Sequence, residues 1–377
     1  MPVVAIDARM IGEVPHGIAR YVKNLAFGLE RLGGLRYDPV FLVSEKGRSQ
    51  LPASFRTLCL RSPFLSAREL IEVSRELKSL APDLYHSPSF SSLIHSPCPW
   101  LVTIHDLNHL RFGGLREKVY YRAILKPFAL GARRVVTVSE FSQRQIATWL
   151  KRPVSQIEIV YNAVDPLFCE SDISGPESSN RAMEALRKHH LQPRNYFTFF
   201  SHHSKPHKNS DFLLSAYFEA RRREPSLPFL AVNATREELS SLGMAPGTSG
   251  LICLGKIPDT ELKPLLQHAR AVLFPSSFEG FGLPPLEAAI LGARVLVSDI
   301  PPHREALVDF SPPQLQWLNP ADSESWIQAL VRLLGPEAAQ ADHSASPEQV
   351  ARAEARFSVR GLAEHMDRIY RAVLQLG

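Results

Sequence analysis

Two glutamates stand eight positions apart in the segment FEGFGLPPLE, directly after the apolar run AVLFPS. The run predicts a buried strand, and Pro284 and Pro285 favour a helix start between the glutamates, because the first helical turn needs no backbone donor from them. Glu279 would then lie on a loop and accept hydrogen bonds from sugar hydroxyls, while Glu287, one turn inside the helix, would hold a ribose diol. The alternative is an ordinary strand, turn and helix with two solvated carboxylates.

The same segment has the composition of a phosphate-binding turn. Gly280 and Gly282 let the backbone approach a ligand closely. The amides at the start of the helix would present partial positive charge to a diphosphate. These features predict a phosphate cradle next to the two glutamates.

A basic stretch, SHHSKPHKN, follows another apolar run, YFTFFS. Lys208 precedes a helix whose expected N-terminal cap is Asn209 or Ser210, so its ammonium group would meet a diphosphate at the helix start. The alternative is an exposed surface lysine. The adjacent His202 and His203 are not expected to bind a metal, because no carboxylate or cysteine partner stands nearby.

A histidine ends the apolar run WLVTIH. His105 is followed by Asp106, and the two side chains form either part of a site or a satisfied structural pair. Ligands of open parallel sheets bind beyond the carboxyl ends of the strands, so the position of His105 favours a site.

Short β-branched runs alternate with helical patterns along the chain, which predicts parallel sheets covered by helices on both faces. The first half contains VVAIDA, PVFLVS, WLVTIH, RVVTVS and IEIVYN, and the second half contains YFTFFS, PFLAVN, GLICLG, AVLFPS and RVLVS. Helices are expected over residues 17–32, 67–80, 115–130 and 140–150 in the first half. We therefore expect an α/β protein with two Rossmann-like, doubly wound domains that face a cleft.

Breaks in this rhythm predict the domain boundaries. Residues 1–165 are expected to form an N-terminal domain, and 166–189, which contains SDISGPESSN, a connection. Residues 190–355 are expected to form a C-terminal domain, and 356–377 a terminal helix. In that helix Leu362, Met366 and Ile369 recur at helical spacing.

Composition indicates a folded protein of two domains. The 377 residues are 45% hydrophobic and 21% charged, which does not suggest disorder. The N-terminus lacks the pattern of a signal peptide, and no run approaches the roughly 18 apolar residues of a membrane-spanning helix. The four cysteines are scattered, without the spacing of a zinc site. We therefore expect a soluble, cytoplasmic protein.

Basic residues concentrate between Arg111 and Arg134, where Lys and Arg face only Glu117, although the whole chain carries a net charge of only +5. This segment is either a solvated helix face or a surface that contacts an anionic acceptor or membrane. Nucleic acid is not expected as a partner, because neither aromatic interleaving nor a known binding module is present.

Together these segments resemble the family-four retaining glycosyltransferases of the GT-B fold. The pattern of Glu, seven residues and Glu in EGFGLPPLE is similar to the signature of that family. Further similar pieces are HGIARYVKNL, TIHDLNHL, VVTVSEFSQRQI, IEIVYNAVD, KPHKN and VSDIPPHREAL, which extend the resemblance over nearly the whole chain.

The resemblance implies that residues 1–165 bind the acceptor, that residues 190–355 bind the nucleotide sugar, and that the helix at 356–377 returns to the N-terminal domain. It also implies roles for individual residues. The catalytic residues would be His105, Lys208 and Glu279, with Glu279 on the transferred sugar and His105 facing it. The donor-binding residues would be Gly17, Gly280, Phe281, Gly282, Leu283 and Glu287. The family usually carries an arginine a few positions before the lysine, and this chain lacks it. Phosphate contacts would then come from His202, His203 or Lys205.

The implied activity is transfer of a sugar from a nucleotide diphosphate to an acceptor hydroxyl with retention of configuration. No cofactor and no metal are expected, because Lys208 and the helix-start amides would neutralise the leaving diphosphate. Overall resemblance to bacterial polysaccharide mannosyltransferases favours GDP-mannose over UDP-sugars, with a glycan or lipid-linked acceptor. Peripheral contact with the inner face of the membrane would involve the basic segment from Arg111 to Arg134.

Three alternatives remain open. The same fold hosts glycan phosphorylases and nucleotide-sugar epimerases. A degenerate subunit that activates a true transferase would explain the missing arginine. A dinucleotide oxidoreductase is disfavoured, because no G-x-G-x-x-G follows the first apolar run.

Overall fold

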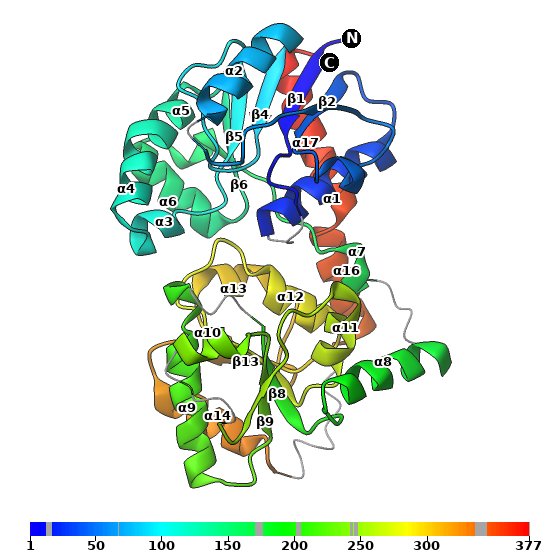
Figure 1. Cartoon of the computed structure of the whole chain (residues 1–377), viewed down its shortest axis with the longest axis vertical. Helices are drawn as coiled ribbons and strands as arrows, with labels where there is room; N and C mark the ends of the chain where they lie inside the picture. Colours follow the sequence, from blue (N-terminus) through cyan, green and yellow to red (C-terminus); the bar gives the residue numbers. More distant parts are fainter. Residues whose placement is uncertain are drawn as a thin grey trace. The chain divides into compact units, whose positions relative to one another are not determined.

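The computed structural model divides the chain into two compact units, Met1–Asp165 with Ala355–Gly377, and Pro166–Glu354. It describes residues 1–12, 17–66, 68–169, 176–200, 205–241, 244, 248–335 and 345–376. Each unit is built on one parallel β-sheet with helices packed against it (Figure 1). The expected fold class, two Rossmann-like domains, is confirmed.

The first unit contains one seven-stranded sheet. Its strands are β1 (Val3–Asp7), β2 (Asp38–Val43), β3 (Arg56–Cys59), β4 (Leu84–Ser87), β5 (Trp100–Thr103), β6 (Arg134–Thr137) and β7 (Ile157–Ile159). They pair in parallel in the order β3-β2-β1-β4-β5-β6-β7. The order reverses between β1 and β4, which is the doubly wound arrangement.

The helices of this unit follow the strands along the chain. They are α1 (Gly17–Leu32), α2 (Glu69–Leu80), α3 (Asn108–Phe112), α4 (Leu115–Tyr120), α5 (Lys126–Gly131), α6 (Glu140–Leu150) and α17 (Val359–Leu374), with short turns η1 (Arg48–Gln50) and η3 (Val154–Gln156). Helix α1 spans the predicted residues. The helix expected over 115–130 is interrupted, because a π-helical turn, η2 (Tyr121–Leu125), separates α4 from α5.

Helix α17 packs along α1 in the first unit, as expected for the terminal helix. The two backbones approach closely at Gly28, where a Cβ would lie 2.7 Å from the Cβ of Ala363. Buried His86 of β4 binds α17 through Tyr370, whose hydroxyl lies 2.6 Å from Nδ1, and β5 through Thr103, whose hydroxyl lies 2.9 Å from Nε2. Burial lowers the pKa of His86 to about 3, so a neutral imidazole ties the helix to the sheet.

The second unit contains a six-stranded sheet with the same doubly wound arrangement. Its strands are β8 (Tyr196–Phe199), β9 (Phe229–Val232), β10 (Leu251–Cys253), β11 (Ala271–Phe274), β12 (Val295–Ser298) and β13 (Leu315–Leu318). They pair in parallel in the order β10-β9-β8-β11-β12-β13. The strand order reverses between β8 and β11.

The helices of the second unit complete its layers. They are α7 (Pro166–Cys169), α8 (Pro176–Lys188), α9 (Ser210–Arg223), α10 (Arg236–Ser241), α11 (Asp259–Gln267), α12 (Leu283–Ile290), α13 (Pro301–Ala306) and α14 (Ser323–Arg332), with a short turn η4 (Pro206–Lys208). Helix α16 (Pro347–Arg356) runs across the boundary between the units.

The stretch 166–189, expected as a connection, is largely helical and belongs to the second unit. Ala185 and Leu186 of α8 are buried. Lys188 Nζ and His189 Nε2 lie 2.6 and 2.8 Å from the carboxylate of Glu261 on α11. Helix α8 is therefore held to this unit by an apolar face and an ion pair.

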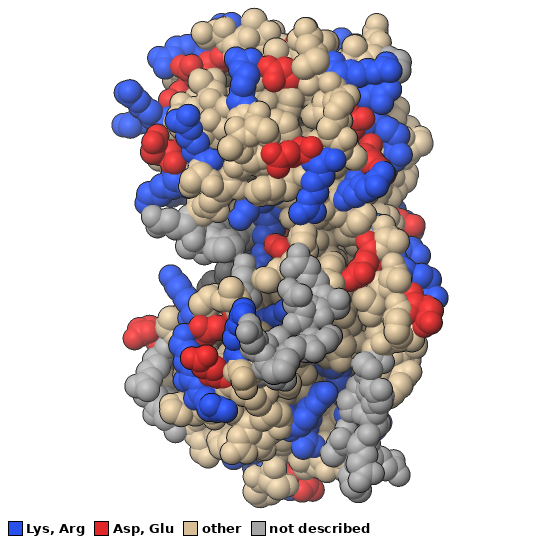
Figure 2. All heavy atoms as spheres, turned by 90° about the vertical axis from the view of Figure 1, so that its right-hand side faces the viewer, with Lys and Arg blue, Asp and Glu red and all other residues tan. Residues whose placement is uncertain are grey.

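The surface of the described residues carries both signs of charge. Figure 2 shows Lys and Arg side chains interspersed with Asp and Glu on one face. Several of the surface charges are paired, as Arg360 is with Glu364 at 2.7 Å. Mixed charges of this kind do not produce a strong field of one sign. No helix in the described part of the chain is both long and apolar enough to cross a bilayer.

Candidate active site

The second unit places two predicted site residues at the reversal of its strand order. Strands β8 and β11 are neighbours there, and ligands of such sheets bind beyond the carboxyl ends of the strands at the reversal. The loop after β8 carries Lys208 and the loop after β11 carries Glu279. The Lys208 Nζ lies 2.7 Å from Glu279 Oε1, so residues 71 positions apart in the sequence share one site.

Hydrogen bonds clamp these two loops together. The Ser277 amide donates to the His207 carbonyl oxygen at 2.8 Å. The Asn209 side chain donates to the carbonyl oxygens of Pro275 and Pro320, at 3.2 and 3.0 Å. Asn209 does precede α9, but its side chain does not cap the helix, contrary to expectation. It joins three loops at the carboxyl edge of the sheet instead.

The ion pair is partly withdrawn from water. The side chains of Lys208 and Glu279 are 17% and 14% exposed. Burial raises the pKa of Glu279, but the Lys208 ammonium, helped by a hydrogen bond from Ser276, outweighs it and holds that pKa below its usual range. Glu279 is therefore an ionised hydrogen-bond acceptor at neutral pH.

The turn between Glu279 and α12 contains a backbone conformation that favours glycine. Gly282 has a φ of +114°, which side chains other than glycine rarely adopt, and it immediately precedes α12. Pro284 and Pro285 in the first turn of α12 have no N–H. The amides that this end can offer a ligand are therefore those of Leu283 and the turn before it.

The other predicted donor-binding residues follow along the same segment. Gly280 and Phe281 are buried and Leu283 is half-buried. Glu287 lies inside α12 and is only 4% exposed. The alternative of two solvated carboxylates is therefore wrong, because both glutamates are largely withdrawn from water.

The structure adds His303, which sequence reasoning did not single out although VSDIPPHREAL contains it. His303 lies on α13, after β12, and is fully buried. A Cβ on Gly282 would lie 2.9 Å from its Cδ2, so the ring touches the turn of the site. The signal that could have identified His303 is its position after the apolar run RVLVS, which is comparable to the position of His105 after WLVTI.

The first unit carries His105 at the carboxyl end of β5. His105 Nε2 lies 2.9 Å from the carbonyl oxygen of Pro88, so Nε2 carries the hydrogen and donates it. The ring meets Tyr21 of α1 edge-on, with ring centroids 4.9 Å apart. Gly17 is the exposed first residue of α1. Asp106 accepts a hydrogen bond from the Asn108 amide at the start of α3.

The substitute for the missing arginine stays a prediction. His202 and His203 lie outside the described residues. Lys205 is exposed and precedes η4, which carries Lys208.

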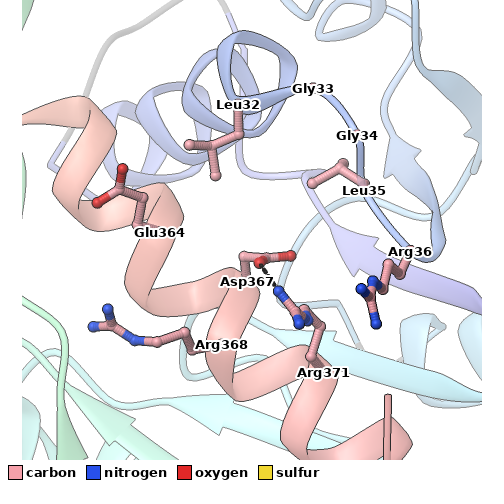
Figure 3. A pocket seen from close by; sticks show the side chains of 9 residues that line it. All are labelled: Leu32, Gly33, Gly34, Leu35, Arg36, Glu364, Asp367, Arg368 and Arg371. Atoms are coloured by element: carbon pink, nitrogen blue, oxygen red, sulfur yellow. Dashed lines mark ion pairs between the residues drawn. The ribbon is translucent and has the colours of Figure 1, made fainter. Parts of the chain in front are cut away.

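A pocket of about 330 Å³ lies at the opposite, amino edge of the first sheet (Figure 3). It is lined by the loop from Leu32 to Arg36 and by α17, where Asp367 pairs with Arg371 at 3.6 Å. None of the predicted site residues lines it. We therefore separate this pocket from the candidate active site.

A solved structure with the same architecture identifies the class of fold. Sucrose-phosphate synthase from Thermosynechococcus elongatus matches with a TM-score of 0.73 at 15% identity, covering 100% of both chains. The two doubly wound sheets and this likeness define a GT-B fold.

Sequence comparison then identifies the family. Glycosyltransferase Family 4 matches residues 15–167, and Glycosyl transferases group 1 matches residues 194–335. The chain is 30% identical to O-antigen chain mannosyltransferase B of Escherichia coli over 318 residues, 78% of this chain and 81% of that one. It is 28% identical to O-antigen chain mannosyltransferase RfbU of Salmonella typhimurium over 235 residues, 61% and 59% of the two chains. The chain belongs to the family 4 glycosyltransferases, as the resemblance predicted.

Proposed function

We propose that this chain transfers mannose from GDP-mannose to a glycan or lipid-linked acceptor in polysaccharide synthesis, with retention of configuration. A UDP-sugar that donates glucose or another hexose is the second candidate. The Lys208–Glu279 pair at the strand-order reversal carries the proposal. The names of the two mannosyltransferase relatives support the choice of sugar.

The residues of the second unit would divide the work on the donor. Glu279, an ionised acceptor, would bind sugar hydroxyls, and Glu287 the ribose. Lys208 and the amides of Phe281, Gly282 and Leu283 would stabilise the diphosphate, because preorganised donors lower the energy of developing negative charge. His105 would contact the donor sugar.

Same-face attack is the route to retention that we favour. The acceptor oxygen bonds to the anomeric carbon as the bond to the diphosphate breaks, and the hydroxyl proton passes to the departing phosphate oxygen. A covalent route would need a carboxylate nucleophile. Glu279 is a carboxylate of the proposed donor site, and Lys208 already engages it. The absence of a metal requirement stays a prediction.

Thermal-shift measurements with a panel of nucleotide sugars test the proposed function. A ligand at about a hundred times its dissociation constant stabilises by roughly 2.7 kcal/mol, so GDP-mannose should raise the melting temperature most. Stabilisation by no nucleotide sugar would contradict the proposal. Phosphate-dependent cleavage of a disaccharide would instead indicate a phosphorylase, and donor binding without any transfer a non-catalytic subunit.

We also propose that helix α4 contacts an anionic membrane at the cytoplasmic, inner face. Leu115 and Val119 are 78% and 53% exposed and stand one helical turn apart. Arg116 and Arg122 are exposed beside them. Apolar side chains flanked by basic ones suit an interfacial helix, which buries the former in the headgroup region and pairs the latter with anionic lipid.

Charge reversal of Arg116, Lys118 and Arg122 should abolish most sedimentation with phosphatidylserine-containing vesicles. Each basic residue near such a surface contributes about 1 kcal/mol. High salt should mimic the loss in the wild-type protein, because it screens these charges.

The control reverses three exposed basic residues elsewhere, Lys46, Arg48 and Arg61. Equal losses in both triple variants would indicate a net-charge effect without a docking helix. A wild-type protein that ignores the vesicles at low salt would rule out membrane contact.

A further inference from the structure

His303 is a buried imidazole whose tautomer the structure determines. Its Nδ1 lies 2.9 Å from the carbonyl oxygen of Ser298, so Nδ1 donates and Nε2 is left as an acceptor in the neutral ring. Nε2 has no hydrogen-bond partner among the described residues. Burial lowers the pKa of His303 more than Glu279 raises it, and Lys208 lowers it further, so the ring is neutral at neutral pH.

The edge of this ring lies directly against the turn that carries Glu279. A Cβ on Gly282 would lie 2.9 Å from His303 Cδ2 and 3.7 Å from Nε2. The ring thus occupies the space that a side chain at position 282 would need. The φ of +114° at position 282 would also strain the backbone of any residue other than glycine.

Helix α13 and one hydrogen bond fix the position of the ring. Pro301 and Pro302 begin the helix, and the Ser298 carbonyl that accepts from Nδ1 ends β12. The imidazole is therefore anchored at one edge to the sheet and presents its other edge to the turn. A turn of glycines has little stiffness of its own, because glycine populates many backbone conformations.

We propose that His303 is a positioning residue of the donor site. Its ring packs against the turn Glu279–Gly282 and keeps the Glu279 carboxylate within hydrogen-bond distance of Lys208. The effect of His303 on sugar transfer rests on the proposed function. Its support of the turn does not depend on that function.

Kinetics of three His303 variants test the effect on transfer. His303→Ala should lower kcat/KM for the donor by about 100-fold, the loss typical of a misplacement of about 1 Å in an active site. His303→Phe, which keeps a ring beneath the turn, should recover most of the loss, whereas His303→Asn, which keeps only an amide for the Ser298 carbonyl, should not. Arg304→Ala is the control, because Arg304 lies on the same helix with its side chain 51% exposed.

A double-mutant cycle tests the contact with Gly282. Gly282→Ala should weaken donor binding less in the His303→Ala background than in the wild-type protein, because the neighbouring ring is gone. Contacting residues show such non-additivity. Strictly additive losses of donor affinity would overturn the proposal. Equal activity of the His303→Ala and wild-type proteins would overturn it as well.

Hydrogen exchange gives a readout without a substrate. The amides of residues 280–283 should exchange faster in His303→Ala than in His303→Phe, while exchange in β12 stays unchanged. Unchanged exchange in the turn would overturn the positioning role even if transfer is observed. If the wild-type protein transfers no sugar but the turn loosens as expected, the proposed function fails and the positioning role stands.

Discussion

Single-turnover rates at saturating donor are expected to fall about 100- to 1,000-fold in Lys208→Ala, whereas donor affinity falls less. Negative charge on the leaving diphosphate increases as the glycosidic bond breaks, so an ammonium group beside it stabilises the transition state more than the bound donor. The amides of the turn before α12 share the ground-state charge, which limits the loss of affinity.

A second effect of the same substitution must be separated from the first. Without Lys208, burial is expected to raise the pKa of Glu279, because the ammonium is what holds that pKa down. A rate lost through protonation of Glu279 would recover as the pH rises and the carboxyl group ionises again. A rate lost through the leaving group would not recover.

The decisive comparison is between rate and dissociation constant. Lys208→Arg should retain more activity than Lys208→Ala, because it keeps a cation near Glu279. Glu279→Gln keeps the lysine and removes the charge of its partner, so it reports the role of the carboxylate separately. A Lys208→Ala protein with weakened donor binding but a wild-type single-turnover rate would show that Lys208 only anchors the donor.

Nucleotide affinity is expected to fall about 10- to 100-fold in Glu287→Ala, since hydrogen bonds to a charged group contribute about 1.5 to 3 kcal/mol. Glu287 is 4% exposed inside α12, immediately behind the turn that would hold the diphosphate. Calorimetric titration with the free nucleoside diphosphate measures this effect without transfer.

Burial of Glu287 calls for two controls. Glu287→Gln keeps the volume and one carbonyl acceptor, so it should bind nucleotide better than Glu287→Ala. Thermal unfolding of both variants distinguishes a lost ribose contact from a loosened α12. Unchanged nucleotide affinity in a folded Glu287→Ala protein would remove Glu287 from the ribose role.

Local patterns were enough to predict the class of fold and most of its elements. The alternation of apolar runs with helical patterns predicted two parallel sheets, and α1 begins and ends at the predicted residues. Periodicity is a property of neighbours in the sequence, so it can be read without tertiary contacts. A second rule singled out Lys208 and Glu279 as site candidates: residues just after parallel strands gather at one edge of a sheet.

Elements without a clean local pattern were missed. Strand β4 has the sequence LYHS and is fully buried, although its polar residues predict exposure. Burial of His86 is possible because Tyr370, 284 positions away, lies within hydrogen-bond distance of its ring. No local pattern reports such a partner.

Tertiary structure alone decided how the site residues are paired and supported. It placed Lys208 against Glu279, turned the Asn209 side chain from the expected cap toward Pro275 and Pro320, and set His303 beneath Gly282. Each of these contacts joins segments that follow different strands. Their geometry depends on strand order and on packing between loops, which hydrophobic periodicity along the chain does not encode.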